Sequence, residues 1–475
     1  MALAVVLPLA AIIAPYRHVF LPSLFILGIA LLGGVWCLRM AVQKVEKLLF
    51  IFLLYIPFQK VLPGDFGGAA KALNFTNVLL ILLFVGWLVR PRADDEDAGR
   101  SRNRWTAQGI AIFAFLIVMS LSIAAEAVQQ TGDMRYELLA DLKRWLTPFL
   151  VYLFVTSFGR STTLVKRMCI AIVVTTAIIG LLGVKQFWMD MGGGTRHNLE
   201  GIRIEVTSGP SNLGALFAYY VPYIFALWVA NFWSISYWFL VFPLFWCLDA
   251  LRTTFSRGAL LAFVVGALAI VLKRSKLAFG AIAIAAVCFF LQVDAIQLPY
   301  SIFGRMSNTY NANRPGDTVS EKLDTSSRTR LVIWSGALQM MKDHPLFGVG
   351  YGRFHEEIGK YRPEVADMDP HNNFLKIGAE TGMPALALFV VLLLVCFWRG
   401  WRCYGKLDDP FLKAIVLGYC GSVVALAVAN MFGSRLDSDE ITTQFWAMTG
   451  GIVLIERSIR RKAAEEAEVA GDVTT

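Results

Sequence analysis

The stretch Asp369-Pro370-His371-Asn372-Asn373-Phe374 marks the point at which the longest polar segment of this chain meets an apolar run again. That run covers residues 373–398, and a helix needs about 17–25 apolar residues to cross the hydrocarbon core of a bilayer. Backbone groups in lipid must be satisfied inside the segment, so a helix is expected rather than an open strand. The stretch therefore predicts a membrane helix that begins beside a polar segment.

Apolar runs of this kind recur along nearly the whole chain. Of its 475 residues, 56% are hydrophobic and 17% charged, whereas soluble domains have about 45–50% apolar and 25% charged residues. The runs lie near residues 2–14, 19–38, 46–62, 73–89, 106–125, 145–158, 165–189, 212–231, 233–250, 255–272, 277–293, 373–398, 411–432 and 441–457. The sequence predicts an all-α integral membrane protein, a polytopic bundle of 12–14 transmembrane helices, because segment 2–14 is short for a span.

Lysine and arginine residues mark one set of alternate connections between these runs. The basic connections lie near residues 39–47, 90–104, 160–167, 273–276, 399–413 and 457–462. Short basic loops stay in the cytoplasm, so all six connections and both termini are expected there, with Arg17 a mild exception. The net charge of +9 therefore indicates topology and lipid contacts rather than binding of nucleic acid.

The longest polar segment, residues 294–370, then falls on the opposite side of the membrane. It is too long for a simple connector and should be partly folded. The expected organisation has helices 1–11 in residues 1–293, the polar loop with an amphipathic helix in 294–370, helices 12–14 in 371–457 and a cytoplasmic tail in 458–475.

The cysteines give no sign of a metal site or a disulfide framework. All seven lie in or beside apolar runs, and none forms a Cys-x-x-Cys pair. The segment His355-Glu356-Glu357 lacks the His-Glu-x-x-His spacing of a zinc helix. We therefore expect no metal and no cofactor.

His371 is the candidate reactive group. Asp369 fits an N-cap and Pro370 fits the first helical position, which predicts that His371 lies in the first turn of a helix. The positive end of the helix dipole would keep the ring neutral, as a general base requires. Gly378 and Gly382 would share its helix face within about 20°, which predicts a shallow groove beneath the imidazole. The alternative is an interfacial histidine followed by glycines that serve helix packing.

Arg257 is a candidate ligand for an anion. It stands between the small residues Ser256 and Gly258 at the start of an apolar run. A guanidinium in mid-bilayer costs about 2.5–3.5 kcal/mol, which favours a functional reason for its presence. The alternative is an arginine near the end of its span that reaches the interface.

A second candidate, Arg330, lies in a segment that resembles a capped amphipathic helix from Ser326 to about Lys342. The apolar residues at helical spacing are Leu331, Trp334, Leu338 and Met341. Arg330 and Trp334 are four residues apart and therefore neighbours on the surface. A planar guanidinium suits bidentate binding of phosphate, although a solvated surface arginine is the alternative.

The order of these residues carries more information than any one of them. It comprises Arg203, Pro210-Ser211-Asn212-Leu213-Gly214, Ser256-Arg257-Gly258, Arg330 with Trp334, His344-Pro345-Leu346-Phe347-Gly348-Val349-Gly350, His371-Asn372, Gly378 and Glu380-Thr381-Gly382. This order resembles the O-antigen ligase and polymerase superfamily of bacterial envelope glycosyltransferases.

The resemblance implies a GT-C-type fold and a glycan donor carried on undecaprenyl diphosphate. Transfer would go to an acceptor hydroxyl at the periplasmic face of the bacterial inner membrane, with inversion and without metal. By position, His371 would be the base, and Arg257, Arg330 and Arg203 would bind the diphosphate. The supporting residues would be Asn372, Trp334, His344, Gly378 and Gly382.

Three functions are compatible with these features. A ligase would use a lipid A-core sugar as its acceptor, and a polymerase would use another lipid-linked repeat unit. The compact segment that carries the key residues slightly favours the ligase. A transporter or flippase of lipid-linked sugars would need charged residues along a path through the membrane, and the predicted spans are nearly free of internal charge.

Overall fold

The computed structural model describes residues 35, 38–40, 42–59, 75–89, 107–129, 133–159, 161–193, 206, 209–276, 309–311, 318 and 321–472. The predicted segments 2–14 and 277–293, most of 19–38 and the candidate Arg203 lie outside these residues. Within the described part, the regular elements are helices, and one isolated bridge joins Tyr310 to Leu323.

The bundle is built from long apolar helices. Six stretches of the described chain are long and apolar enough to cross a membrane. They lie in α5 (Ala107–Gln129), α7 (Thr162–Gly193), α8 (Pro210–Ala230), η4 (Ile235–Leu240) with α9 (Val241–Thr253), α16 (Met383–Tyr404) and α17 (Pro410–Asn430). Beside them pack α3 (Val45–Tyr55), η1 (Ile56–Phe58), α4 (Phe75–Val89), α6 (Asp133–Phe158), α10 (Arg257–Arg274) and α18 (Asp439–Asp472). The prediction of an all-α, multi-pass membrane protein is confirmed.

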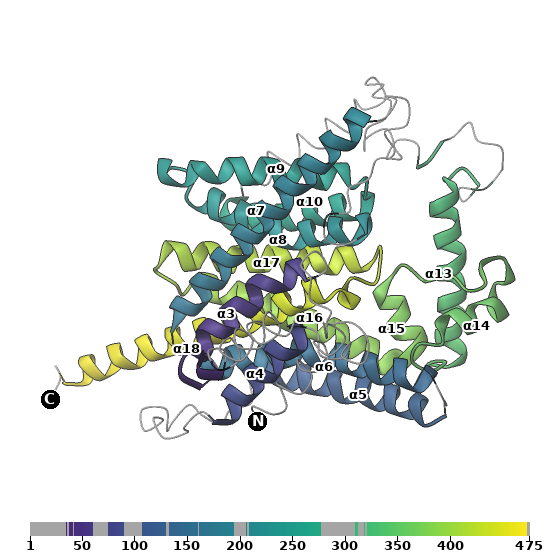
Figure 1. The fold of residues 1–475 in the computed structure, drawn as a ribbon, viewed down its shortest axis with the longest axis horizontal. Helices are drawn as coiled ribbons and strands as arrows, with labels where there is room; N and C mark the ends of the chain where they lie inside the picture. Colours follow the sequence, from purple (N-terminus) through teal and green to yellow (C-terminus); the bar gives the residue numbers. More distant parts are fainter. Residues whose placement is uncertain are drawn as a thin grey trace, which may run out of the picture.

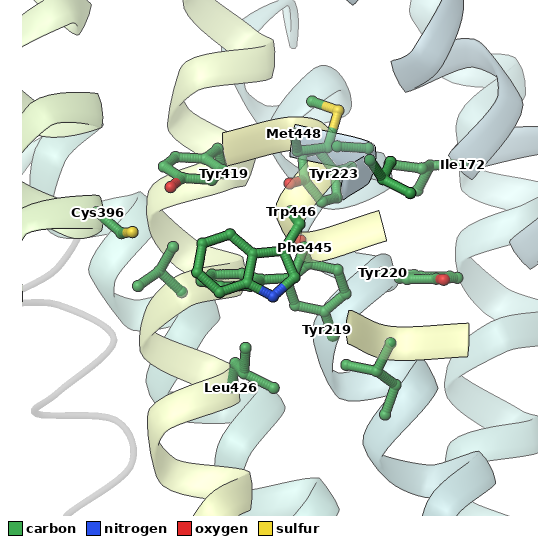
Figure 2. Packing of buried hydrophobic residues seen from close by; sticks show 14 of the residues in the cluster. Ile172, Tyr219, Tyr220, Tyr223, Cys396, Tyr419, Leu426, Phe445, Trp446 and Met448 are labelled. Carbon is green, nitrogen blue, oxygen red and sulfur yellow. The ribbon is translucent and has the colours of Figure 1, made fainter. Parts of the chain in front are cut away.

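α8 and α17 form the centre of this bundle. In their apolar stretches 78% and 72% of the residues are buried in protein, against 33% for residues 235–253 at the edge. Aromatic side chains fill the space between α8, α17 and α18, as Figure 2 shows for Tyr219, Tyr223, Tyr419 and Phe445. Such residues bury a large apolar area, so these helices give the polar end a rigid base.

The predicted span 373–398 is two helices. α15 (Asn373–Thr381) ends before Gly382, and α16 begins at Met383 with Pro384 in its first turn. Gly382 has φ +88, a backbone conformation that glycine adopts without strain. The single continuous helix was therefore a wrong prediction, and the membrane-crossing part starts about ten residues later than expected.

Ion pairs at one end of the bundle join connections that the basic pattern assigned to the same side. The pairs are Lys166 with Asp409, Lys462 with Asp408, and Arg399 with Glu456. Lys273 also lies over the ring of Trp401, 4.0 Å from its centroid. The basic connections 160–167, 273–276, 399–413 and 457–462 therefore meet at one end.

The opposite end carries α13 (Thr325–Asp343), α14 (Phe354–Tyr361), η6 (Pro363–Val365) and α15, as Figure 1 shows. The predicted amphipathic helix is confirmed, and the Asp324 side chain caps it by accepting from Ser327 N. Its buried face is different from the predicted one, because Leu331 and Leu338 are 42% and 49% exposed. The buried residues of this small core are Ile333, Ala337, Met340, Met341, Phe354, Ile358, Val365 and Ala379.

Candidate active site

His371 lies in a tight turn just before α15. Asp369 Oδ1 accepts from His371 N at 2.7 Å and lies 3.3 Å from His371 Nδ1. Trp334 Nε1 of α13 donates to Pro370 O at 2.9 Å and fixes the turn from the other side. His371 itself has φ +48, a left-handed conformation that costs a non-glycine residue about 1–2 kcal/mol. The side chain is 54% exposed, so a substrate can reach it.

The helix begins later than the sequence predicted. Asn372 is the N-cap, and its Oδ1 accepts from Phe374 N at 3.0 Å and Leu375 N at 3.2 Å. Asp369 cannot cap α15, because it binds the backbone of His371 instead. His371 is therefore outside the helix rather than in its first turn, and the helix dipole is a wrong explanation for a neutral ring.

Other charges favour a neutral imidazole. Burial lowers the pKa of His371, and the positive charges of Arg330 and Arg435, together with His355, lower it further. Asp369 acts in the opposite direction and raises this pKa, but the net effect is a decrease. With Nδ1 facing Asp369, the other ring nitrogen, Nε2, is the one able to accept a proton from a substrate.

Gly378 of α15 and Gly382, which follows it, serve packing. A methyl group on Gly378 would lie 2.7 Å from Met341 Cε of α13, and one on Gly382 would clash with the backbone of Leu346. Because His371 lies outside α15, it does not share a helix face with Gly378 as predicted. Gly378 instead lets α13 approach α15, the helix that follows the histidine.

Arg257 and Arg330 are brought into one electrostatic environment. Arg257 is the first residue of α10, at the end of its helix as expected, and its Nη1 lies 2.7 Å from Asp324 Oδ2. Burial lowers the pKa of Arg330, and Arg257 lowers it further. Both side chains stay cationic at neutral pH. The chain thus assembles two guanidinium groups and the His371 ring from three elements far apart in sequence.

Asp324 links these groups. It caps α13 through Ser327 N at 2.8 Å and pairs with Arg257, and its carboxylate raises the pKa of Arg330. These contacts lower the pKa of Asp324 itself, although burial opposes them. The carboxylate therefore stays charged near pH 7, and it holds α13 against the start of α10.

Asn212 gains a partner that the sequence did not indicate. Arg435 of η7 (Arg435–Asp437) donates from Nη1 to Asn212 Oδ1 at 2.5 Å. Asn212 stands in the first turn of α8, so the Pro210-Ser211-Asn212 motif reaches the same polar end as Arg257. Arg435 lies in a short connection without a recognisable motif, and only the fold brings its charge near enough to act on His371.

His344 is separated from this cluster. It follows the last residue of α13, 14 residues beyond Arg330, or about 20 Å along a helix that rises 1.5 Å per residue. Its carbonyl accepts from Gly348 N at 3.1 Å, and the glycines after it lie in turns. Gly348 has φ +66, and a methyl group there would lie 2.5 Å from Ala379 O. The motif thus supports the C-terminal end of α15.

A narrow apolar crevice lies beside η7, inside the bundle. Phe389, Leu436 and Trp446 are among its lining residues, and its volume of about 10 Å³ has room for about one water molecule. It is too small for a glycan or a lipid chain. The charged cluster at the end of the bundle remains the candidate site.

Comparison with known proteins gives one match. Residues 242–390 match the model of a protein family described as O-antigen ligase. This segment contains Arg257, Arg330 and His371 and ends before Arg435. A search of curated proteins found no match to the chain.

Proposed function

From the match of residues 242–390 to the O-antigen ligase family, we propose that the chain is an enzyme of the O-antigen ligase and polymerase superfamily that transfers a glycan from undecaprenyl diphosphate to an acceptor hydroxyl. The observation that supports the proposal is the assembly of His371 and two arginines at one end of the bundle, opposite the basic connections. Basic connections are typical of the cytoplasmic side, so this end would face the periplasm, with the protein in the bacterial inner membrane.

In the proposed reaction, His371 Nε2 takes the proton of the acceptor hydroxyl. The acceptor oxygen attacks the anomeric carbon of the donor glycan from the face opposite the diphosphate and forms the new glycosidic bond. The bond between this carbon and the diphosphate oxygen breaks, and its electron pair leaves with the diphosphate. Configuration is therefore inverted, and the proton on His371 passes to solvent.

Arg257 and Arg330 would bind the leaving group. Negative charge grows on the diphosphate oxygens as the glycosidic bond breaks, and fixed cations stabilise such charge most when solvent is partly excluded. Both arginines are partly buried and held on helix starts. They supply the positive charge that a metal ion supplies in other transferases, so we propose that transfer needs no metal.

We favour the ligase reaction, with a lipid A-core sugar as the acceptor. The segment 321–370 packs compactly around a small core that it shares with α15, and this compactness supports the choice of the ligase. The polymerase reaction, with a second lipid-linked repeat as the acceptor, is the alternative.

Purified protein in detergent or vesicles tests the proposal. The donor is lipid-linked glycan, and the acceptor is either lipid A-core or further lipid-linked repeats. A single addition to the core supports the ligase, and a ladder of products supports the polymerase. His371→Ala should lower the transfer rate by about 10²–10⁴-fold, the usual contribution of a general base, with unchanged expression and insertion.

The control for this experiment is His344→Ala, because His344 lies far from the cluster. It should keep most of the wild-type rate. Wild-type transfer by His371→Ala would contradict the mechanism, and loss of transfer on addition of a chelator would contradict the metal-free reaction.

A further inference from the structure

Arg435 occupies a place prepared for its guanidinium. Any methyl group on Gly433 would clash with the guanidinium of Arg435, so the glycine makes room for this side chain to fold back over the chain. Nη2 donates to Phe432 O at 3.2 Å, and Nη1 donates to Asn212 Oδ1 at 2.5 Å. The backbone N of Arg435 donates to Asn430 Oδ1 at 3.2 Å. These contacts hold the cation in one orientation.

The residues that hold Arg435 belong to well-packed helices. Asn430 is fully buried at the end of α17 and donates to Leu426 O at 2.8 Å. Both α8, which contributes Asn212, and α17 are central helices of the bundle. The guanidinium is therefore held by the rigid part of the molecule, which is the arrangement that favours tight recognition of a charged group.

Packing brings this segment onto the start of α10. A methyl group on Gly258 would lie 2.6 Å from Phe432 Cβ, so Phe432 rests directly on the residue after Arg257. One on Gly214 would lie 2.9 Å from Ala259 Cβ and 3.2 Å from Ser256 Cβ. Glycines at the starts of α8 and α10 thus let Asn212, Arg257 and Arg435 converge at one corner of the bundle.

We propose that Arg435 is a third arginine of the substrate site, which binds the diphosphate of the lipid-linked donor from the side of the membrane bundle. This inference rests on the proposed function. Arg330 lies on α13, outside the membrane bundle, whereas Arg435 lies in η7, in the connection between α17 and α18. A diphosphate attached to a membrane-embedded lipid chain would meet Arg435 on its membrane side. Asn212 is then the positioning residue that holds this guanidinium.

The consequence reaches His371. The charged and titratable groups that act on its ring are Asp369 from its own turn, Arg330 from α13, His355 from α14 and Arg435 from η7. Without the Arg435 charge, the ring would bind a proton more readily, and a neutral base would need a higher pH. Arg435 would therefore affect both donor binding and the pH at which the base works.

The test compares Arg435→Gln, Arg435→Lys and Asn212→Ala in the transfer assay. Arg435→Gln should raise KM for the donor and the inhibition constant of added inorganic pyrophosphate, each by roughly 10-fold or more, and should lower kcat by up to about 10²-fold. The acid limb of its pH–rate profile, where the rate falls as the base becomes protonated, should move to higher pH. Arg435→Lys keeps the charge, so its acid limb should match the wild type while KM stays raised, because an ammonium lacks the planar fork. Asn212→Ala should raise KM moderately.

The matched control is Arg252→Gln, since Arg252 at the end of α9 pairs with Asp249 at 2.7 Å and lies outside the cluster. It should leave KM and the acid limb unchanged. If Arg435→Gln lowers stability in detergent but leaves KM, pyrophosphate inhibition and the acid limb at wild-type values, Arg435 is structural and the proposal fails. Inactivity of the wild type itself would instead contradict the proposed function.

Discussion

At the scale of single residues, the immediate surroundings of His371 decide its chemistry. Its backbone stands in the left-handed region, and hydrogen bonds around the turn stabilise this conformation. Asp369 accepts from His371 N, Asn372 accepts from Phe374 N, and Trp334 donates to Pro370 O. Strain of this kind persists only where the surrounding structure enforces it. The ring is consequently presented half-exposed, with one nitrogen facing a carboxylate and the other available to a substrate.

The rate of transfer should rise with pH to a plateau whose midpoint lies below the ordinary histidine pKa of about 6.5. The sign follows from the base, which works only when neutral, and from the decrease of its pKa by burial, Arg330 and Arg435. Asp369→Asn removes the one charge that raises this pKa, so its midpoint should move to still lower pH. The plateau should fall by roughly 10-fold or more, because the ring loses its orienting partner.

A profile of kcat/KM between pH 4.5 and 8.5 measures this midpoint. Asp367→Asn is the control, because Asp367 is an exposed carboxylate two positions before Asp369, whereas the main charges that act on the ring are those of Asp369, Arg330, Arg435 and His355. A shift of the Asp369→Asn midpoint to higher pH would contradict the assignment.

The sequence indicated His371, Arg257 and Arg330 but could not indicate their partners. Asp324 pairs with Arg257 across 67 positions of the chain, and Arg435 meets Asn212 across 223; neither spacing forms a local pattern. Asp369 was read as a helix cap because Asp-Pro commonly precedes a helix. Asn372 is an equally good cap, and the hydrogen bond from Trp334 to Pro370 decides between them.

At the scale of elements, α13 is the part that positions the histidine. It contacts α15 where Gly378 meets Met341, and its Trp334 donates a hydrogen bond to Pro370 O in the turn before His371. The buried face of α13 combines Ile333, Gly336 and Ala337 with Met340 and Met341, so only Met341 of the predicted stripe is buried. Gly336 faces Ile358 of α14 at close range, and periodicity alone does not reveal such a contact.

Trp334→Phe should loosen the turn while it preserves most of the packing. Loss of one partly buried hydrogen bond costs about 1 kcal/mol of stability, and a small misplacement of the base should lower kcat by about 10-fold. KM for the donor should change little, since Arg330 remains in place. Steady-state kinetics and unfolding in detergent measure these effects.

Trp398→Phe is the matched control, because Trp398 is 51% exposed on α16 towards the opposite end of the bundle. It should leave kcat unchanged. A Trp334→Phe variant with unchanged kcat would show that the hydrogen bond to Pro370 does not position the base.

At the scale of the whole molecule, the charged residues at the two ends of the bundle have different roles. The basic end is joined by ion pairs between connections, and the other end gathers the candidate site. Hydropathy predicted the described spans well, because an apolar segment in lipid can hydrogen-bond all of its backbone groups internally only as a helix. It misplaced the start of α16, since Asn373–Thr381 is apolar enough to continue a span but packs on α13 instead.

Arg399→Ala should lower the stability of the bundle without loss of transfer by the folded protein. Arg399 and Glu456 join α16 to α18, with side chains only 12% and 18% exposed. Removal of the cation leaves a partly buried carboxylate, which costs roughly 1–3 kcal/mol. Unfolding in detergent and transfer per folded molecule are the measurements.

Arg461→Ala is the control, because its pair with Glu465 is mostly exposed and such pairs contribute little. Equal stability of Arg399→Ala and wild type, or a matching loss of specific activity, would contradict the expectation.

Asp324 provides the candidate site with an internal counter-ion. Its carboxylate forms an ion pair with Arg257. An anion that binds Arg257 must therefore compete with this carboxylate, which carries a single negative charge. We expect a monoanion to gain little from that exchange, whereas a diphosphate, with more charge and more acceptor oxygens, would displace it. Because the same carboxylate caps α13, occupancy of the site and the order of the outer helix become thermodynamically linked. The helix that delivers Arg330 and steadies His371 would thus respond to the arrival of the donor itself.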